Sequence, residues 1–131
     1  MREGNYLIKI NIRYKTVNKN MIPDWAYAVN CAITVCDADC KIIYMNEKSR
    51  ATFSPDGSLI GKSLIGCHSP HSVEIIRRLL AEGGVNVYTI EKNGVRKMIY
   101  QTAWRQTDGT VGGLVEISMV IPAEMPHYVR S

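Results

Sequence analysis

The sequence predicts an α+β fold: a five-stranded antiparallel sheet, with short helices and one longer helix inserted between strands 2 and 3. Two turn signals in the second half support this fold. Asn93-Gly94 and Asp108-Gly109 separate segments rich in strand formers, and Asn-Gly favours a tight hairpin because both residues tolerate positive φ. A third observation is the amphipathic segment between Ser69 and Gly84, which follows two short strand-like segments.

The first half of the chain predicts a short helix and a hairpin. Residues 22–30 begin with a proline near a helix entry and an acidic residue in the first turn, which complements the helix dipole. Residues 31–36 and 41–45 are rich in strand formers, and Asp37 to Asp39 supply turn chemistry between them. We therefore expect these two segments to pair.

Helices are expected next, before the last three strands. Asn46 is suited to cap a helix over residues 47–53, and a one-turn helix is predicted near residues 58–64. Ser69 and Pro70 start the longer helix, whose apolar positions fall on one stripe. Gly83 and Gly84 end it. The predicted closing strands cover residues 85–91, 95–106 and 111–121.

Length and composition indicate one domain. The chain has 131 residues, of which 46% are hydrophobic and 21% charged, enough to bury a core without disulfides or metals. We expect an N-terminal extension over residues 1–20, with a possible strand at Tyr6 to Tyr14, a domain over residues 21–122 and a tail over residues 123–131. A disordered leader is the alternative for the extension.

The distribution of charged and apolar residues indicates where the protein resides and which partners are not expected. No apolar run approaches the roughly 20 residues needed to cross a bilayer, and no secretory signal is recognisable. We therefore expect a cytoplasmic protein with reduced cysteines. The formal charge of +4 is spread along the chain, which does not indicate a nucleic-acid partner, and no membrane partner is expected.

The order of elements resembles the PAS superfamily over about residues 24–121. Residues 37–46 are similar to the family's first hairpin, although Cys40 stands where glycine is usual, which implies a turn that does not need glycine there. Gly61-Lys62-Ser63-Leu64 is similar to the Gly-x-Ser-Leu before the long helix, and residues 104–118 are similar to the closing strands. Residues 66–72 resemble a Cys-His-Pro-containing loop found in a subset of bacterial PAS domains.

This resemblance implies a sensory, signal-transducing module rather than an enzyme. It implies a small-molecule ligand or a partner protein bound between sheet and helices, homodimerisation and a separate output protein. A dimerisation or scaffold module with no ligand is the alternative. No catalytic constellation is visible, and nucleophilic catalysis by Cys67 is disfavoured because adjacent side chains on an extended segment point apart.

The densest chemical cluster in the sequence is Cys67, His68 and His71. On a continuous helix, Cys67 with His71, or His68 with His71, would share a face. The cluster supplies too few ligands for structural zinc, whereas haem would need only one axial histidine, held without covalent attachment. The light-sensing flavin motif Asn-Cys-Arg is absent, so flavin is not expected. A purely structural role, with the histidines bonded to loop carbonyls and Cys67 buried, also accounts for the cluster.

Four large side chains of the predicted closing strands are further candidates for the ligand pocket. Tyr88, Met98, Tyr100 and Trp104 lie on predicted strands, where inward-pointing side chains would flank a ligand or simply fill the core. Cys36 and Cys40 would face one another across the first turn, as a redox pair or as buried free thiols. We expect Glu116 to be solvated.

Overall fold

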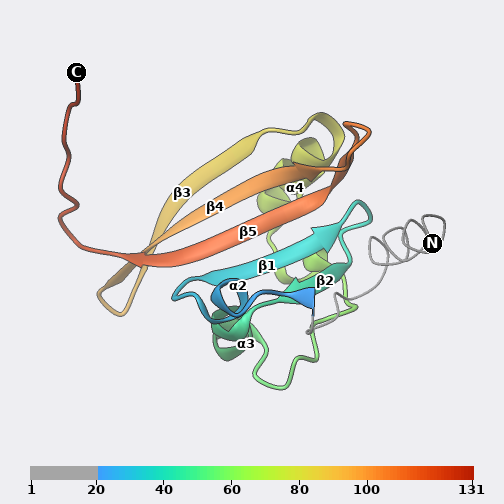
Figure 1. Cartoon of the computed structure of the whole chain (residues 1–131), viewed down its shortest axis with the longest axis horizontal. Coiled ribbons are helices and arrows are strands. Elements are labelled where there is room, and N and C mark those ends of the chain that lie inside the picture. Colours follow the sequence, from blue (N-terminus) through green and yellow to red (C-terminus); the bar gives the residue numbers. More distant parts are fainter. Residues whose placement is uncertain (1–20) are drawn as a thin grey trace.

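The computed structural model describes residues 21–131, and the predicted strand at 6–14 lies outside this range. A five-stranded antiparallel sheet has the strand order β2-β1-β5-β4-β3 (Figure 1). Its strands are β1 (Ala32–Asp37), β2 (Ile42–Met45), β3 (Val85–Lys92), β4 (Val95–Arg105) and β5 (Val111–Ile121). The predicted fold class is confirmed, with a short helix, a 3-10 turn and the longer helix between β2 and β3.

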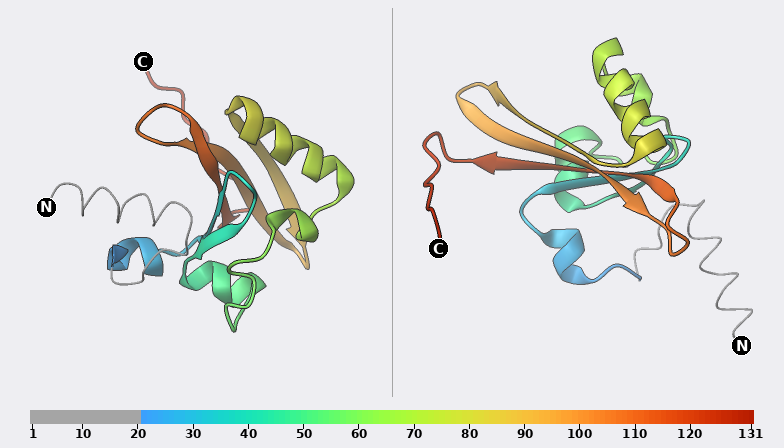
Figure 2. Two further views of the ribbon diagram at one scale, coloured as in Figure 1. Left: turned by 90° about the vertical axis from the view of Figure 1, so that its right-hand side faces the viewer. Right: turned by 90° about the horizontal axis from the view of Figure 1, so that it is seen from above.

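The helices occupy both sides of the sheet. The longer helix α4 (Pro70–Glu82) lies on one side and the short α2 (Asp24–Ala28) on the other (Figure 2). Helix α3 (Glu47–Phe53) and the 3-10 turn η2 (Leu64–Cys67) connect β2 to α4. The face that α4 covers is called the helix-facing face below, and the opposite one the outer face. No helix in residues 21–131 is long and apolar enough to cross a membrane.

Local sequence signals account for the helix boundaries. The Asn46 side chain accepts a hydrogen bond from Ser49 N (3.0 Å), and Ser69 accepts one from Ser72 N (3.3 Å). Each bond satisfies a backbone donor that the first helical turn leaves free. Asn46 is completely buried and also donates to Cys31 O (2.9 Å), so it joins α3 to the start of β1.

Two expectations about turns are corrected. Residues 58–62 form turns and a bend, Ser63 bridges to Lys41, and the short helix is a 3-10 helix at Leu64–Cys67. Cys40 has φ 63, a left-handed conformation that favours glycine. The turn therefore has the backbone geometry for which glycine is usual, although cysteine occupies the position. Asn93 and Gly94 have φ 53 and 77, as the hairpin signal predicts.

The core lies between the sheet and α4. Ile76 and Leu79 of α4 are fully buried and pack with Ile42, Met45 and Leu114 on the helix-facing face. Burial of large aliphatic side chains of this kind contributes roughly 1.5–3 kcal/mol each. Beyond this contact, most of β3 is exposed, which leaves the sheet open beside α4.

Candidate functional site

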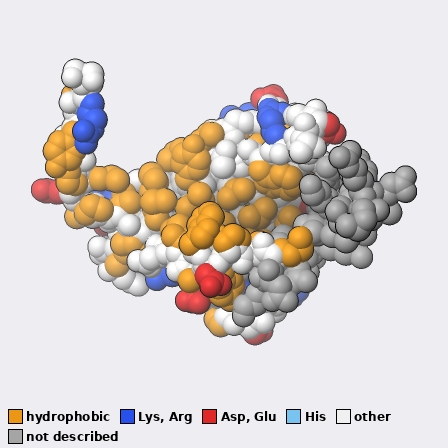
Figure 3. Space-filling view, viewed as in Figure 1, with side chains coloured by type: hydrophobic (Ala, Val, Ile, Leu, Met, Phe, Trp, Pro, Cys, Tyr) orange, Lys and Arg blue, Asp and Glu red, His pale blue; other side chains and the backbone are white. Residues whose placement is uncertain are grey.

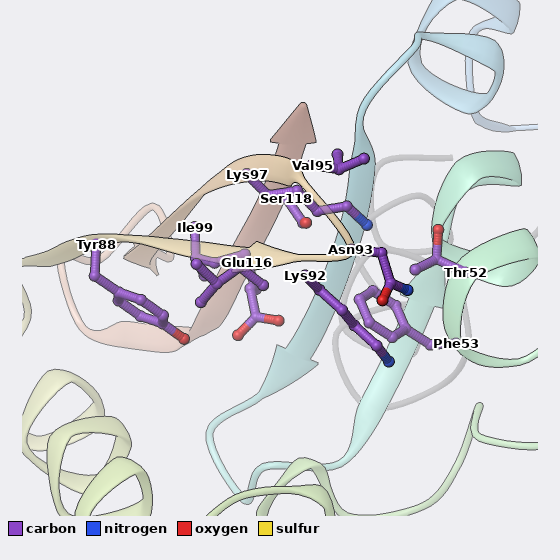
Figure 4. Close-up of a pocket in the computed structure, with 11 residues that line it drawn as sticks. Thr52, Phe53, Tyr88, Lys92, Asn93, Val95, Lys97, Ile99, Glu116 and Ser118 are labelled. Atoms are coloured by element: carbon purple, nitrogen blue, oxygen red, sulfur yellow. The ribbon is translucent and has the colours of Figure 1, made fainter. Parts of the chain in front are cut away.

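Three hollows follow one another along the helix-facing face. An inner cavity of about 250 Å³ lies among β1, β2, α3 and η2, and its lining includes Phe53, His68 and Glu116. A groove of about 700 Å³ continues from it over β3, β4 and β5 and shares Phe53 and Glu116 (Figure 4). A third hollow of about 290 Å³ lies beside α4 and shares Tyr88 with the groove. Glu116 therefore stands where the cavity meets the groove.

A chain of side-chain hydrogen bonds crosses the three C-terminal strands at this point. Asn86 Nδ2 donates to Gln101 Oε1 (2.9 Å), and Gln101 Nε2 donates to Glu116 Oε2 (2.8 Å). The strand register explains the alignment, because Asn86 pairs with Gln101 and Gln101 pairs with Glu116. Directly paired residues of antiparallel strands project to the same face, so three polar side chains meet in a row.

His68 extends this chain to the segment that leads into α4. Its Nδ1 lies 2.8 Å from Leu64 O, and its Nε2 lies 3.6 Å from Glu116 Oε2. His68 has extended backbone (φ −123, ψ 152) between η2 and α4, and its side chain is only 16% exposed. The backbone leading into the long helix is thus linked electrostatically to the centre of β5.

The two charged groups stabilise each other's ionised forms. The interaction with Glu116 raises the pKa of His68 against the opposing effect of burial. For Glu116, burial alone would raise the pKa, but His68 and the hydrogen bond from Gln101 outweigh it and hold the pKa below its usual value. Near neutral pH, Glu116 is therefore an ionised carboxylate facing the cavity and the groove.

The expectation that Glu116 is solvated is wrong. Its side chain is 14% exposed, since it shares the helix-facing face with Leu114 and Ser118. The two sequence neighbours of Glu116, Val115 and Ile117, are apolar and lie on the opposite face of β5. A lone acidic residue between apolar neighbours inside a strand is the signal that sequence reasoning missed.

Strand alternation divides the predicted ligand residues between the two faces. Tyr88 lines the groove, His68 the inner cavity and His71 the hollow beside α4. Three other predicted ligand residues of β4 lie on the face opposite to Gln101 and so point away from these hollows: Met98, Tyr100 and Trp104. Trp104 Nε1 instead donates to Cys36 O (3.1 Å).

Cys67, His68 and His71 do not lie on one continuous helix. Cys67 belongs to η2, His68 follows in extended backbone and His71 is in the first turn of α4. The Cys67 side chain lies outside what the structure describes. Among the described residues, no group of three His, Cys, Asp or Glu side chains is placed to hold a metal ion.

Haem ligation by His68 does not fit this arrangement. With Nδ1 bonded to Leu64 O, as the second nitrogen of a ligating histidine often is, Nε2 would have to hold the iron, but Nε2 faces Glu116 at 3.6 Å. His71 is exposed and lines the hollow beside α4, not the groove. The bond to Leu64 O is the contact with a loop carbonyl that a structural role for His68 predicts.

Cys36 and Cys40 are buried free thiols. Burial raises the pKa of Cys36 to about 12, which keeps its thiol protonated and weakly nucleophilic. Burial likewise raises the pKa of Cys40, although the nearby Arg77 opposes this effect. Both side chains belong to the hydrophobic core cluster.

Solved structures share this arrangement of sheet and helices. The PAS domain of histidine kinase ThkA is 13% identical with a TM-score of 0.58, over 68% of this chain and 97% of that one. A sensory box sensor histidine kinase from Vibrio cholerae is 12% identical with a TM-score of 0.56, over 93% and 99%.

The chain has the PAS fold.

A larger structure with a similar fold is VqmA bound to DPO, which is 11% identical with a TM-score of 0.60. The match covers 74% of this chain and 55% of VqmA, so the chain spans about half of that protein. No protein-family model matches the chain, and no curated protein sequence matches it. At these identities the PAS fold is what the chain shares with the three structures.

Proposed function

We propose that this chain is a sensory, signal-transducing PAS module that binds a small ligand between the sheet and the helices. The observation that carries the proposal is the continuity of the inner cavity with the groove at Glu116. Pockets for small molecules are concave and mostly apolar, with a few polar groups that fix the ligand's orientation. Phe53, Ile99 and Met45 supply apolar walls, while Glu116 and His68 are the polar groups.

The contacts of Glu116 suggest how occupancy would be transmitted. A ligand that competes for Glu116 would weaken its 3.6 Å contact with His68, which adjoins the first turn of α4. It would thereby shift the population between two packings of this segment, provided that it binds one of them better. The VqmA structure with DPO shows a PAS-fold protein with a bound ligand, which supports the proposal by analogy.

Native mass spectrometry of the protein purified from its own host tests this function. The expected result is a population heavier than the bare chain by the mass of one small molecule per chain. An absorption spectrum of the same sample reports haem or flavin. A mass equal to that of the bare chain, in protein that also binds nothing from a host metabolite extract, would contradict ligand sensing and favour a scaffold.

The second candidate function is dimerisation through the outer face. Hydrophobic side chains gather there over the strands (Figure 3). They include Tyr100, Ile117 and Met119, which are half-buried in the part of the chain that the structure describes. A VqmA dimer from Vibrio cholerae is among the matching folds, which favours a second copy of this chain as the occupant.

Light scattering across a range of concentrations tests dimerisation. Wild type is expected to have twice the monomer mass, and Ile117→Lys the mass of one chain. Lys97→Glu, on the helix-facing face, is the matched control and should remain dimeric. A wild type that stays monomeric at all concentrations would contradict this candidate.

We further propose that a separate output protein in the cytoplasm receives the signal.

A further inference from the structure

Glu116 has one carboxylate oxygen committed to protein partners and one that is not. Oε2 accepts the bond from Gln101 and faces His68. Oε1 has no hydrogen-bond partner among the described residues, although the side chain is 14% exposed. A carboxylate offers about four acceptor positions, so an oxygen without a protein partner retains capacity for a donor from the cavity.

The hydrogen bonds between Asn86, Gln101 and Glu116 all run from donor to acceptor in the same direction. Asn86 donates to Gln101, and Gln101 donates to Glu116, so both amides direct N–H groups toward the carboxylate. This order fixes the Gln101 amide with its oxygen toward Asn86. The row therefore ends in an acceptor at the cavity and offers no N–H donor to the same position.

The surroundings of Glu116 are largely apolar. The inner cavity is lined mainly by aliphatic and aromatic side chains, among them Ile42, Met45 and Phe53. The Thr34 hydroxyl there is already engaged with Ser49 Oγ at 2.5 Å. Glu116 is the only carboxylate that lines either the cavity or the groove within the described residues.

We propose that the ligand is a small molecule with an apolar ring or chain and a donor nitrogen, an amine or a ring N–H, that binds Glu116 Oε1. This inference rests on the proposed ligand-binding function and narrows it to one chemical class. A hydrogen bond to a charged acceptor contributes about 1.5–3 kcal/mol, more than a neutral one. A ligand that presents only acceptors would place its lone pairs against the ionised Glu116 oxygen and be rejected.

The groove also gives the ligand an orientation. Lys92 and Lys97 line the groove toward the Asn93-Gly94 turn, and Figure 4 shows Lys92 beside Phe53, with the Glu116 carboxylate between Tyr88 and Lys92 in that view. Lys97 lies four residues from Gln101 on β4, or about 13 Å along the strand. The donor nitrogen therefore faces Glu116, and any acceptor group on the ligand can face the lysines.

Three matched probes test the ligand class: benzylamine, benzyl alcohol and benzoate. Each is titrated into ¹⁵N-labelled full-length protein while backbone and side-chain amide signals are followed. Benzylamine is expected to shift the Gln101 and Asn86 side-chain amides saturably, benzyl alcohol to bind more weakly and benzoate to leave these signals unchanged. Glu116→Gln should weaken benzylamine about tenfold or more, the equivalent of about 1.4 kcal/mol.

Glu91→Gln is the control, because Glu91 is an exposed glutamate whose side chain is 61% accessible. It should bind benzylamine as wild type does, and the amide spectrum of each variant reports that it is folded. Benzoate binding in the groove with no effect of Glu116→Gln would overturn the donor-nitrogen proposal and leave ligand binding intact. Failure of all three probes to shift the groove signals would also overturn it, whereas native mass spectrometry decides the broader function separately.

Discussion

The two faces of the sheet differ in what their side chains contact. On the helix-facing face, Asn86, Gln101 and Glu116 form a row of hydrogen bonds that runs from the hollow beside α4 to the groove. On the outer face, neighbouring positions such as Tyr100 and Ile117 are apolar and half-buried. Consecutive residues on one strand thus serve different environments, and a carboxylate is held ionised only where partners for it converge.

The largest expected effect is loss of the core beneath α4. Leu79→Ala should lower the free energy of unfolding by about 2–5 kcal/mol, because Leu79 is 1% exposed and its removal leaves a cavity. Urea denaturation measures the change. Ile117→Ala is the outer-face comparison and should cost less, since Ile117 is only half-buried. Equal losses would mean that both faces are packed to the same extent.

Breaking the polar row should have the next largest effect. Gln101→Leu removes the donor to Glu116 and the acceptor for Asn86, and Gln101 is 2% exposed. We expect a loss of about 1–3 kcal/mol in the free energy of unfolding, because buried polar groups lose their partners.

Tyr100→Leu is the matched control for this change, as the adjacent residue on the opposite face. Its expected cost in urea denaturation is below about 1 kcal/mol, because the replacement keeps a large apolar side chain. A larger loss from Tyr100→Leu than from Gln101→Leu would reverse the contrast between the two faces.

Trp104→Phe tests the hydrogen bond that Trp104, on the outer face, makes to the backbone of β1. It removes the hydrogen bond from Nε1 to Cys36 O but retains an aromatic ring over Gly112 and Gly113. The expected loss is about 1 kcal/mol, as for one hydrogen bond of ordinary strength. Thermal unfolding followed by circular dichroism measures it. An unchanged melting temperature would indicate that water replaces the indole at Cys36 O.

The smallest effect concerns the charge pair and depends on pH. Because the folded pKa of His68 is raised, its contribution is complete below the unfolded value of 6.5 and is lost as pH rises through the folded pKa. Because that of Glu116 is lowered, its contribution is present above 4.5 and is lost as pH falls through the folded pKa. The pair should therefore stabilise the fold most between these values.

His68→Gln removes the titrating charge from this pair. The difference in unfolding free energy between wild type and variant should be about 0.5–1 kcal/mol near pH 5.5 and smaller at pH 8.5. Urea denaturation at the two pH values measures it, with His127→Gln, outside the sheet, as the control. A difference that is constant with pH would show that His68 acts only through its bond to Leu64 O.

Local signals in the sequence determined most of the fold. The Asn46 and Ser69 caps, the Asn93-Gly94 turn and the apolar stripe of α4 act within a few residues of where they stand, so the chain specifies them without its partners. The position of η2 could not be predicted from local signals. Hydrogen bonds from Leu64 N to Cys40 O and from Ile42 N to Lys62 O hold this segment against β2, and they join residues far apart in the chain.

The candidate site was decided by tertiary structure. The sequence places His68 in a dense cluster with Cys67 and His71, but the partners that the structure describes for it lie elsewhere. They are Leu64 O and Glu116, and the latter lies on the last strand. Strand register aligns Asn86, Gln101 and Glu116, and register depends on pairing between distant segments. Alternation along each strand places its side chains on two faces from sequence alone. Only the folded sheet decided which face the helices close and which carboxylate becomes buried there.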